Sequence, residues 1–373
     1  MALEPQPRHF QSTPFILSPI AVIVEQELKG WESKRRIDMS GPNSMNKPPE
    51  LSSGVLPRLV FDAACLSPTA SKGAARHMLK TLRLLTTTAS RIAREQKPST
   101  ALDFWAKSLR GPRALASWIE FIANHYSDNG APPPNTRVLR KPQRDYGRTG
   151  RTVQQRVDAL LAHYTCAARG LPVAVQQTLL KDELIHLGKL TARDTHFDLW
   201  LGSSLGAGQK HEGELTVSMT DSSNVILTRI GFSLGIDACG TPAALIGGLQ
   251  GLEAGVDKRV IVKATRTLSG LRPKDAALVA VQSVVKAAGM KHLHAVSNAT
   301  HVQAAEWFRK ASKTMRDYDA FWIERGGTTD DFGGYLLPLR DYQARLKSVQ
   351  DPRRIDLYRA SLSDQVAAVL VAR

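Results

Sequence analysis

The spacing of the apolar residues changes at about residue 183, from helical periodicity to alternation. The alternating segments predict half-buried strands, and Gly, Asp, Asn and Ser separate them. In chain order they read FDLWLGSS, GELTVSMT, VILTRIGFSLG, AALIGGLQG and KRVIVKATR. Helical segments precede these strands, and a helix followed by a short strand comes after them. This order predicts an α+β fold, in which an N-terminal helical region is followed by a mostly antiparallel sheet with a βα-type unit.

The βα-type unit is predicted from RPKDAALVAVQSVVKAAGM and the following KHLHAVS. Pro273 suits the first turn of the helix and Gly289 its C′ position, while Val284 and Val285 belong to an apolar stripe. An earlier helix is expected over TVQQRVDALLAHYTCAA, with Thr152 as its N-cap.

Four regions are predicted along the chain. Residues 1–57 form a poorly ordered leader, because segments such as GPNSMNKPPELSSG cannot bury enough apolar surface to offset chain entropy. Residues 58–126 form a basic helical region, whose last two helices are separated at Gly111-Pro112. Residues 127–152 contain three consecutive prolines and scattered glycines, and are predicted as a linker. Residues 153–373 hold the α+β domain.

The formal net charge of the chain is +16, and it is unevenly distributed. Residues 71–156 carry 17 Lys and Arg against 5 Asp and Glu, which favours an anionic partner such as a coenzyme, a carrier protein, RNA or a membrane surface. The alternative is a solvated basic surface that keeps the protein soluble. Three widely spaced cysteines fit a reducing compartment, and the N-terminus shows neither a signal peptide nor a transmembrane segment. We therefore expect a cytoplasmic protein, of an oligomeric state that the sequence does not determine.

The segment LIGGLQGLEAG, residues 245–255, contains four glycines directly after an apolar run. Its spacing matches neither the dinucleotide fingerprint nor the Walker loop, so a nucleotide loop has weak support. The favoured interpretation is a strand in which Gly247 and Gly248 mark a bulge or a close backbone approach. Gly251 and Gly255 would then form a hairpin turn before another strand.

A better candidate for a phosphate site is ATRTLSGLRPKDA, where a basic loop leads into a helix N-terminus. Such a site would bind the phosphates of coenzyme A or of a carrier-protein arm; the alternative is an ordinary capped helix on a basic surface. The candidate cofactor-binding residues are Gln250, Gly251, Arg266, Gly270, Arg272 and Lys274.

Candidate catalytic residues lie in AVSNATHV and HEGELTVSM. His301 is a candidate general base and Asn298 an orienting or oxyanion-binding group, although a single histidine is often structural. Glu212 and Glu214 share one face of an extended strand, where they suit acid–base work or, alternatively, form a charge pair at a sheet edge. The chain contains no H-E-x-x-H, no G-x-S-x-G and no spaced Cys/His set, so we assign no metal ligand.

Several short motifs occur in an order that resembles the VirK/YbjX-like family of Gram-negative bacteria. They are HYTCAA, EGELTVSM, GFSLG, IGGLQG, SGLRPKDA, HAVSNATHV, DYDAFW and LPLRDY, and they extend over about residues 150–360. The resemblance implies a cytoplasmic protein, with some members linked to virulence and to resistance against antimicrobial peptides. It supplies no established reaction.

Two functions are expected. The first is an acyltransferase similar in plan to the GNAT-like families, which would move an acyl group from acyl-CoA or acyl-carrier protein to an amine or hydroxyl. In that plan a pantetheine arm lies along a splayed strand, and its pyrophosphate meets a helix N-terminus. The second is a non-catalytic regulator that binds RNA or a membrane surface through the basic helical region.

Overall fold

The structure is a computed structural model that describes residues 68–371, except 193, 253–254, 305–316 and 350. The chain forms two compact units, residues 1–106 and 107–373, and each is described by itself. The predicted leader, residues 1–57, lies outside the described residues. No helix in the described part of the chain is long and apolar enough to cross a membrane.

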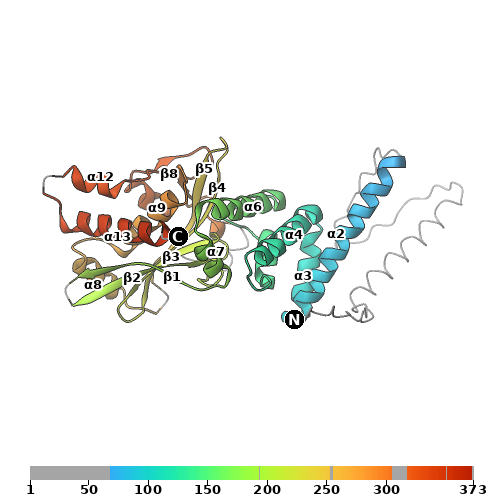
Figure 1. The fold of residues 1–373 in the computed structure, drawn as a ribbon, viewed down its shortest axis with the longest axis horizontal. Coiled ribbons are helices and arrows are strands. Elements are labelled where there is room, and N and C mark those ends of the chain that lie inside the picture. The colour runs from blue at the N-terminus through green and yellow to red at the C-terminus, as the bar shows by residue number, and fades with distance from the viewer. Residues whose placement is uncertain (1–67, 193, 253–254, 305–316, 350, 372–373) are drawn as a thin grey trace, which may run out of the picture. The chain divides into compact units, whose positions relative to one another are not determined.

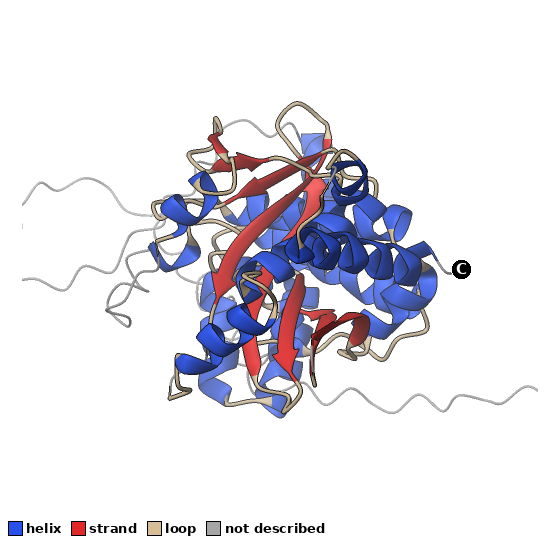
Figure 2. Ribbon diagram, turned by 90° about the vertical axis from the view of Figure 1, so that its left-hand side faces the viewer, coloured by secondary structure: helices blue, strands red, loops and turns tan. Residues whose placement is uncertain are grey.

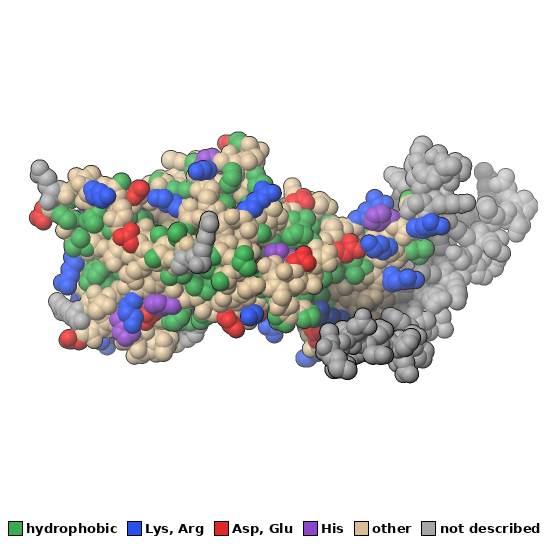
Figure 3. All heavy atoms as spheres, viewed as in Figure 1, with side chains coloured by type: hydrophobic (Ala, Val, Ile, Leu, Met, Phe, Trp, Pro, Cys, Tyr) green, Lys and Arg blue, Asp and Glu red, His purple; other side chains and the backbone are tan. Residues whose placement is uncertain are grey.

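The first unit contains the helix α2 (Pro68–Glu95) and most of α3 (Pro98–Ser108). Leu85, Ala89 and Ile92 follow helical spacing on α2 and are completely buried. The exposed basic residues of α2 include Arg76, Lys80, Arg83 and Arg94. Figure 3 shows Lys and Arg side chains gathered over this helix. The predicted N-terminal helices are confirmed, and α2 carries exposed basic side chains.

The second unit begins with helices. They are α4 (Pro112–Asp128), α5 (Thr136–Leu139), the 3-10 turn η1 (Lys141–Gln143), α6 (Val153–Gly170) and α7 (Val173–Leu180). The break at Gly111-Pro112 is confirmed, because Pro112 begins α4. Thr152 caps α6 as predicted, and with Gln155 it forms a capping box. The segment predicted as a linker packs into this unit, since all three residues of η1 are buried.

One sheet of eight strands follows. Its strands are β1 (Ile185–Ala192), β2 (Thr195–Ser203), β3 (Leu215–Asp221), β4 (Ile226–Ile236), β5 (Pro242–Gln250), β6 (His292–Ala295), β7 (Thr328–Thr329) and β8 (Tyr335–Leu337). Their spatial order is β1-β2-β3-β4-β5-β6-β8-β7, and Figures 1 and 2 show the sheet from two sides. Among the strand pairs that the described residues form, only β5 and β6 run parallel to each other. The predicted α+β class is confirmed.

The remaining helices are α8 (Arg259–Thr267), α9 (Pro273–Ala287), η2 (Val302–Ala304), α11 (Tyr318–Ile323), α12 (Tyr342–Lys347) and α13 (Arg354–Val371). The helix predicted from Pro273 is α9, and Gly289 follows it with φ +76 as expected for a C′ glycine. The prediction of a strand over KRVIVKATR is wrong, because this segment is α8. Val260, Ala264 and Leu268 lie four residues apart and pack on the core, and this helical stripe outweighs the β-branched composition.

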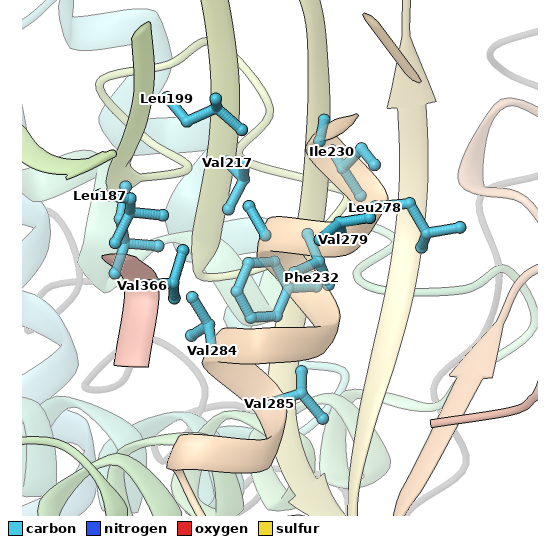
Figure 4. Packing of buried hydrophobic residues seen from close by; sticks show 14 of the residues in the cluster. Leu187, Leu199, Val217, Ile230, Phe232, Leu278, Val279, Val284, Val285 and Val366 are labelled. Carbon is cyan, nitrogen blue, oxygen red and sulfur yellow. The ribbon is translucent and has the colours of Figure 1, made fainter. Parts of the chain in front are cut away.

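The core lies between the sheet and the helices α9 and α13. Inward-facing residues of successive strands, such as Val217, Ile230 and Phe232, meet Val284 of α9 and Val366 of α13 (Figure 4). α9 is buried along most of its length because it crosses the middle of the sheet. In β5 and β6 the core-facing side chains alternate with others that point to the opposite face of the sheet.

The glycine pair of LIGGLQGLEAG is explained by a buried neighbour. Gly231 pairs with Gly248 and Phe232 with Ile246, which leaves Gly247 as a bulge in β5. A Cβ at Gly247 would overlap the backbone oxygen of Glu212, and one at Gly248 would come within 2.7 Å of Glu212 Cγ. The predicted bulge and close backbone approach are therefore confirmed. The predicted hairpin turn at 251–255 is wrong, since β5 is followed by α8.

Candidate functional site

A pocket of about 430 Å³ lies on the face of the sheet opposite α9. Its walls come from α6, from the loop 146–151, from the adjacent ends of β4, β5 and β6, and from the turn that joins β7 to β8. Leu245 and His294, which are opposite each other in the parallel β5–β6 pair, both line it. A pocket of this size holds a small molecule or one end of a longer one.

The most reactive arrangement in this pocket is a pair formed by His294 and Asp330. His294 Nδ1 lies 2.8 Å from Asp330 Oδ2, and the backbone N–H groups of Phe332 and Gly334 donate to Asp330 Oδ1 at 3.0 and 2.8 Å. A carboxylate only accepts hydrogen bonds, so Nδ1 donates, and in the neutral ring Nε2 then carries the lone pair. Nε2 is buried and has no hydrogen-bond partner among the residues that the structure describes. This geometry suits a general base.

A second histidine–aspartate pair lies beside the first. His292 Nδ1 is 2.7 Å from Asp237 Oδ2, and this hydrogen bond, assisted by backbone N–H groups of Cys239 and Thr241, lowers the pKa of Asp237. Asp237, His292 and His294 can each offer one atom to a divalent metal ion, and these atoms lie within 4.8 Å of one another. Such a set suits Zn²⁺ with one open position.

Sequence reasoning missed these residues, although a signal was present. His292 and His294 are two apart in KHLHAVS, which places both side chains on one face of a predicted strand. Asp237 and Asp330 are 55 and 36 residues away from the histidines that they contact. Only the sheet order brings them together, and the sequence alone does not specify that order.

The structure places two of the predicted catalytic residues, Glu212 and His301, in one buried network outside the pocket lining. The backbone N–H of Gln303 donates to His301 Nδ1 at 3.1 Å, so the ring proton lies on Nε2. That Nε2 is 3.3 Å from the hydroxyl of Tyr318 and 3.5 Å from Glu212 Oε1. The neutral ring has one donor and one acceptor, and both are therefore used within the fold.

Asn298 connects the end of β6 to the start of α11. Its Oδ1 accepts from the backbone N–H of Tyr318 at 2.8 Å, and its Nδ2 donates to Asp317 at 3.2 Å. Its own backbone N–H donates to Asp319 at 3.0 Å. These bonds fix the loop that carries His301.

Glu212 and Glu214 do not form an exposed pair at a sheet edge, which corrects the alternative interpretation favoured from the sequence. They are 4% and 5% exposed, and they belong to different networks. Glu212 accepts from the side-chain amides of Gln209 and Gln250 at 2.8 and 3.1 Å. Glu214 accepts from Lys141 and from the hydroxyl of Tyr164.

The predicted phosphate-binding residues gather only in part. Gly270 has φ +95 before α9, and Gly251 lies beside Lys274, whereas Gln250 turns its amide to Glu212. Arg272 at the start of α9 is already paired with Asp275 at 2.9 Å and with Glu324 at 2.7 Å, and the bond to Asp275 is the main reason that its pKa is raised. Arg266 lies exposed on α8.

We expect stability to depend on pH through His163 of α6, which is buried against β4. The backbone N–H of Leu234 donates to its Nδ1 at 3.1 Å, and burial, assisted by the charges of Lys141 and His125, lowers the pKa of His163 to about 4. The folded state therefore holds the neutral ring, whereas the unfolded chain takes up a proton near pH 6.5. The resulting stability is complete above pH 6.5 and is lost as the pH falls toward 4, by about 3 kcal/mol.

Urea unfolding at pH 7, 5.5 and 4.5 measures this effect. His163→Gln, which retains an acceptor for Leu234, should flatten the decline of the free energy of unfolding at low pH. Part of the slope should remain, because burial also lowers the pKa of His211 to about 4. Equal slopes in wild type and variant would contradict the assignment.

Comparison with known proteins gives two matches. The model of the family described as "Protein of unknown function (DUF535)" matches residues 94–369. The "Uncharacterized protein YbjX" of Escherichia coli (strain K12) is 26% identical over 258 residues, which cover 69% of this chain and 77% of that protein.

Proposed function

This chain belongs to the DUF535 family, as its resemblance to VirK/YbjX-like proteins predicts, and we propose that it is an acyltransferase with a GNAT-like plan. The acyl group moves from acyl-CoA or acyl-carrier protein to an amine or hydroxyl acceptor. The observation that carries the proposal is His294 Nε2, which is buried and has no hydrogen-bond partner among the described residues, in the wall of a pocket beside the parallel strands β5 and β6.

The sheet supports the position of the donor. Pairing between β5 and β6 ends at Ile246 and Ala295, while β5 continues past its bulge to Gln250. Beyond that point the chain leads through α8 to the N-terminus of α9. A pantetheine arm would lie along the part of β5 that extends beyond its pairing with β6, and its phosphates would lie near Gly270 and Lys274.

The acceptor occupies the pocket on the other face of the sheet. As its oxygen or nitrogen attacks the thioester carbonyl, its proton passes to His294 Nε2, and Asp330 stabilises the imidazolium. The carbon–sulfur bond then breaks, an ester or amide forms, and the thiol leaves with a proton. We assign the base to His294 in preference to His301, since His301 Nε2 already carries its proton.

Incubation of the purified full chain with acyl-CoA, or with acylated carrier protein, tests the proposal. Amine and hydroxyl acceptors are added in parallel, and loss of thioester absorbance and mass spectrometry of the products are followed. Consumption of thioester that depends on an acceptor and on His294 supports the proposal. If neither donor is consumed faster than without protein, the acyltransferase assignment fails.

The exposed face of α2 favours a second candidate, a regulator that binds RNA or a membrane surface. Arg76, Lys80 and Arg83 are spaced by four and three residues, and Leu79 beside them is 66% exposed. Changing the three basic residues to Glu should weaken binding to RNA or to anionic vesicles by at least about tenfold at low salt. Fluorescence titration measures this, with Arg345→Glu, an exposed residue of α12 outside the basic helical region, as the control. Unchanged binding to both ligands would contradict this candidate.

A further inference from the structure

The pocket wall contains two arginines, Arg148 and Arg151, three residues apart in the segment predicted as a linker. Neither forms an ion pair with a carboxylate among the described residues. Arg151 Nη1 makes one long hydrogen bond, 3.5 Å to the backbone oxygen of Tyr146. Arg148 Nη1 makes another, 3.4 Å to the backbone oxygen of Phe332. A guanidinium has five N–H donors, so most of their capacity remains available.

The carboxylates of the same pocket each have their own partner. Asp330 is bound by His294, Asp237 by His292, and Asp158 accepts from the side chain of Gln154 at 2.8 Å. Among the described residues, none of these carboxylates forms an ion pair with Arg148 or Arg151. Burial, reinforced by the charge of Arg148, lowers the pKa of Arg151 to about 10. An anion bound against the two guanidinium groups would oppose that penalty, because it would place a negative charge directly beside them.

From this geometry we propose that the pocket binds a small molecule through an anionic group, a phosphate or a carboxylate, held by Arg148 and Arg151. Guanidinium groups bind both anions in a bidentate manner, and this gives orientation as well as affinity. The rest of the wall is largely apolar, with Ala162, Ile236 and Leu245 among its residues. The ligand therefore combines an apolar body with one anionic end.

Phe332 contacts both the proposed anion site and His294, the proposed general base. The guanidinium of Arg148 lies 4.7 Å from the centre of the Phe332 ring, and that ring is 6.2 Å, edge to face, from the ring of His294. An anionic group at the arginines thus leaves the other end of the molecule within reach of His294 Nε2. This step rests on the proposed function: the acceptor is then an amphiphilic acid whose nucleophile lies several bonds from its anionic group.

Calorimetric titration of the full chain with inorganic phosphate, and separately with octanoate, at constant ionic strength tests the binding site. We expect at least one of them to bind, and Arg148→Gln and Arg151→Gln each to weaken it by at least about tenfold. The relative affinities identify phosphate or carboxylate as the preferred group. Arg144→Gln, which removes an exposed arginine outside the pocket, should bind as the wild type does. Thermal unfolding without ligand shows that each variant is folded, and the partly exposed Arg148 gives a second test if Arg151→Gln is unstable.

The inference is overturned if neither anion binds, or if both arginine variants bind like the wild type. His294→Gln should retain anion binding, so the two proposals fail separately. Binding without thioester consumption leaves the anion site in place and removes the acyltransferase. Thioester consumption without anion binding does the reverse.

Discussion

His294→Gln is expected to lower the rate of thioester consumption by about 10² to 10⁴-fold, the usual contribution of a positioned general base. Glutamine retains a side-chain amide that can donate to Asp330, but it cannot take up a proton. The free energy of unfolding should change by less than about 1 kcal/mol, because Nε2 makes no hydrogen bond among the described residues. Rates at saturating donor, together with urea unfolding of the same preparations, measure both quantities.

The chain offers a matched control. His186 and Asp198 form a similar pair on β1 and β2, with Nε2 and Oδ1 2.8 Å apart, outside the pocket. His186→Gln should leave the rate unchanged. Asp330→Asn should give an intermediate loss, since it removes the charge that stabilises the imidazolium. If His294→Gln retains the wild-type rate and His301→Gln loses it, the base is His301 as the sequence analysis expects.

The fold could be predicted from the sequence wherever a signal is local. The Thr152 cap, Pro273 and Gly289 delimit α6 and α9 because each acts on its own helix end. The bulge at Gly247 could be predicted as well, although its cause could not. That cause is Glu212, 35 positions earlier in the chain, which lies against the glycine pair. The sequence does not predict the strand β1 and predicts a strand where α8 lies, since short apolar runs fit both periodicities.

The candidate site was less predictable because it depends on contacts between distant segments. Glu212 and His301 do come together, 3.5 Å apart, but inside the fold and away from the pocket. The sequence correctly predicts a strand over KHLHAVS, but it does not mark His294 as a functional residue. Arg148 and Arg151 lie in a segment whose prolines and glycines predict a linker. Composition does not show that this segment packs into the fold, where the hydroxyl oxygen of Tyr146 lies 2.7 Å from that of Ser233.

Lys141→Met is expected to lower the free energy of unfolding by about 3–5 kcal/mol, the cost of leaving one partner of a buried ion pair without the other. Lys141 Nζ lies 2.5 Å from Glu214 Oε1, and the side chains are 5% and 3% exposed. The hydroxyl of Tyr164 donates to Glu214 Oε2 at 2.9 Å. Burial, together with the negative charge of Glu214, raises the pKa of Tyr164 well above its usual value, so this tyrosine remains a donor.

The double variant Lys141→Met, Glu214→Gln should recover most of that loss, because it leaves no uncompensated charge and retains an acceptor for Tyr164. Urea unfolding of the wild type, the two single variants and the double variant completes a double-mutant cycle. A coupling energy of zero would contradict a stabilising interaction between Lys141 and Glu214. The same experiment bears on the pocket. The ion pair between Lys141 and Glu214 joins η1 to the residue that precedes β3. Arg148 and Arg151 follow η1 in the chain. Loss of anion binding in Lys141→Met, with recovery in the double variant, would show that this buried pair holds the anion site in place.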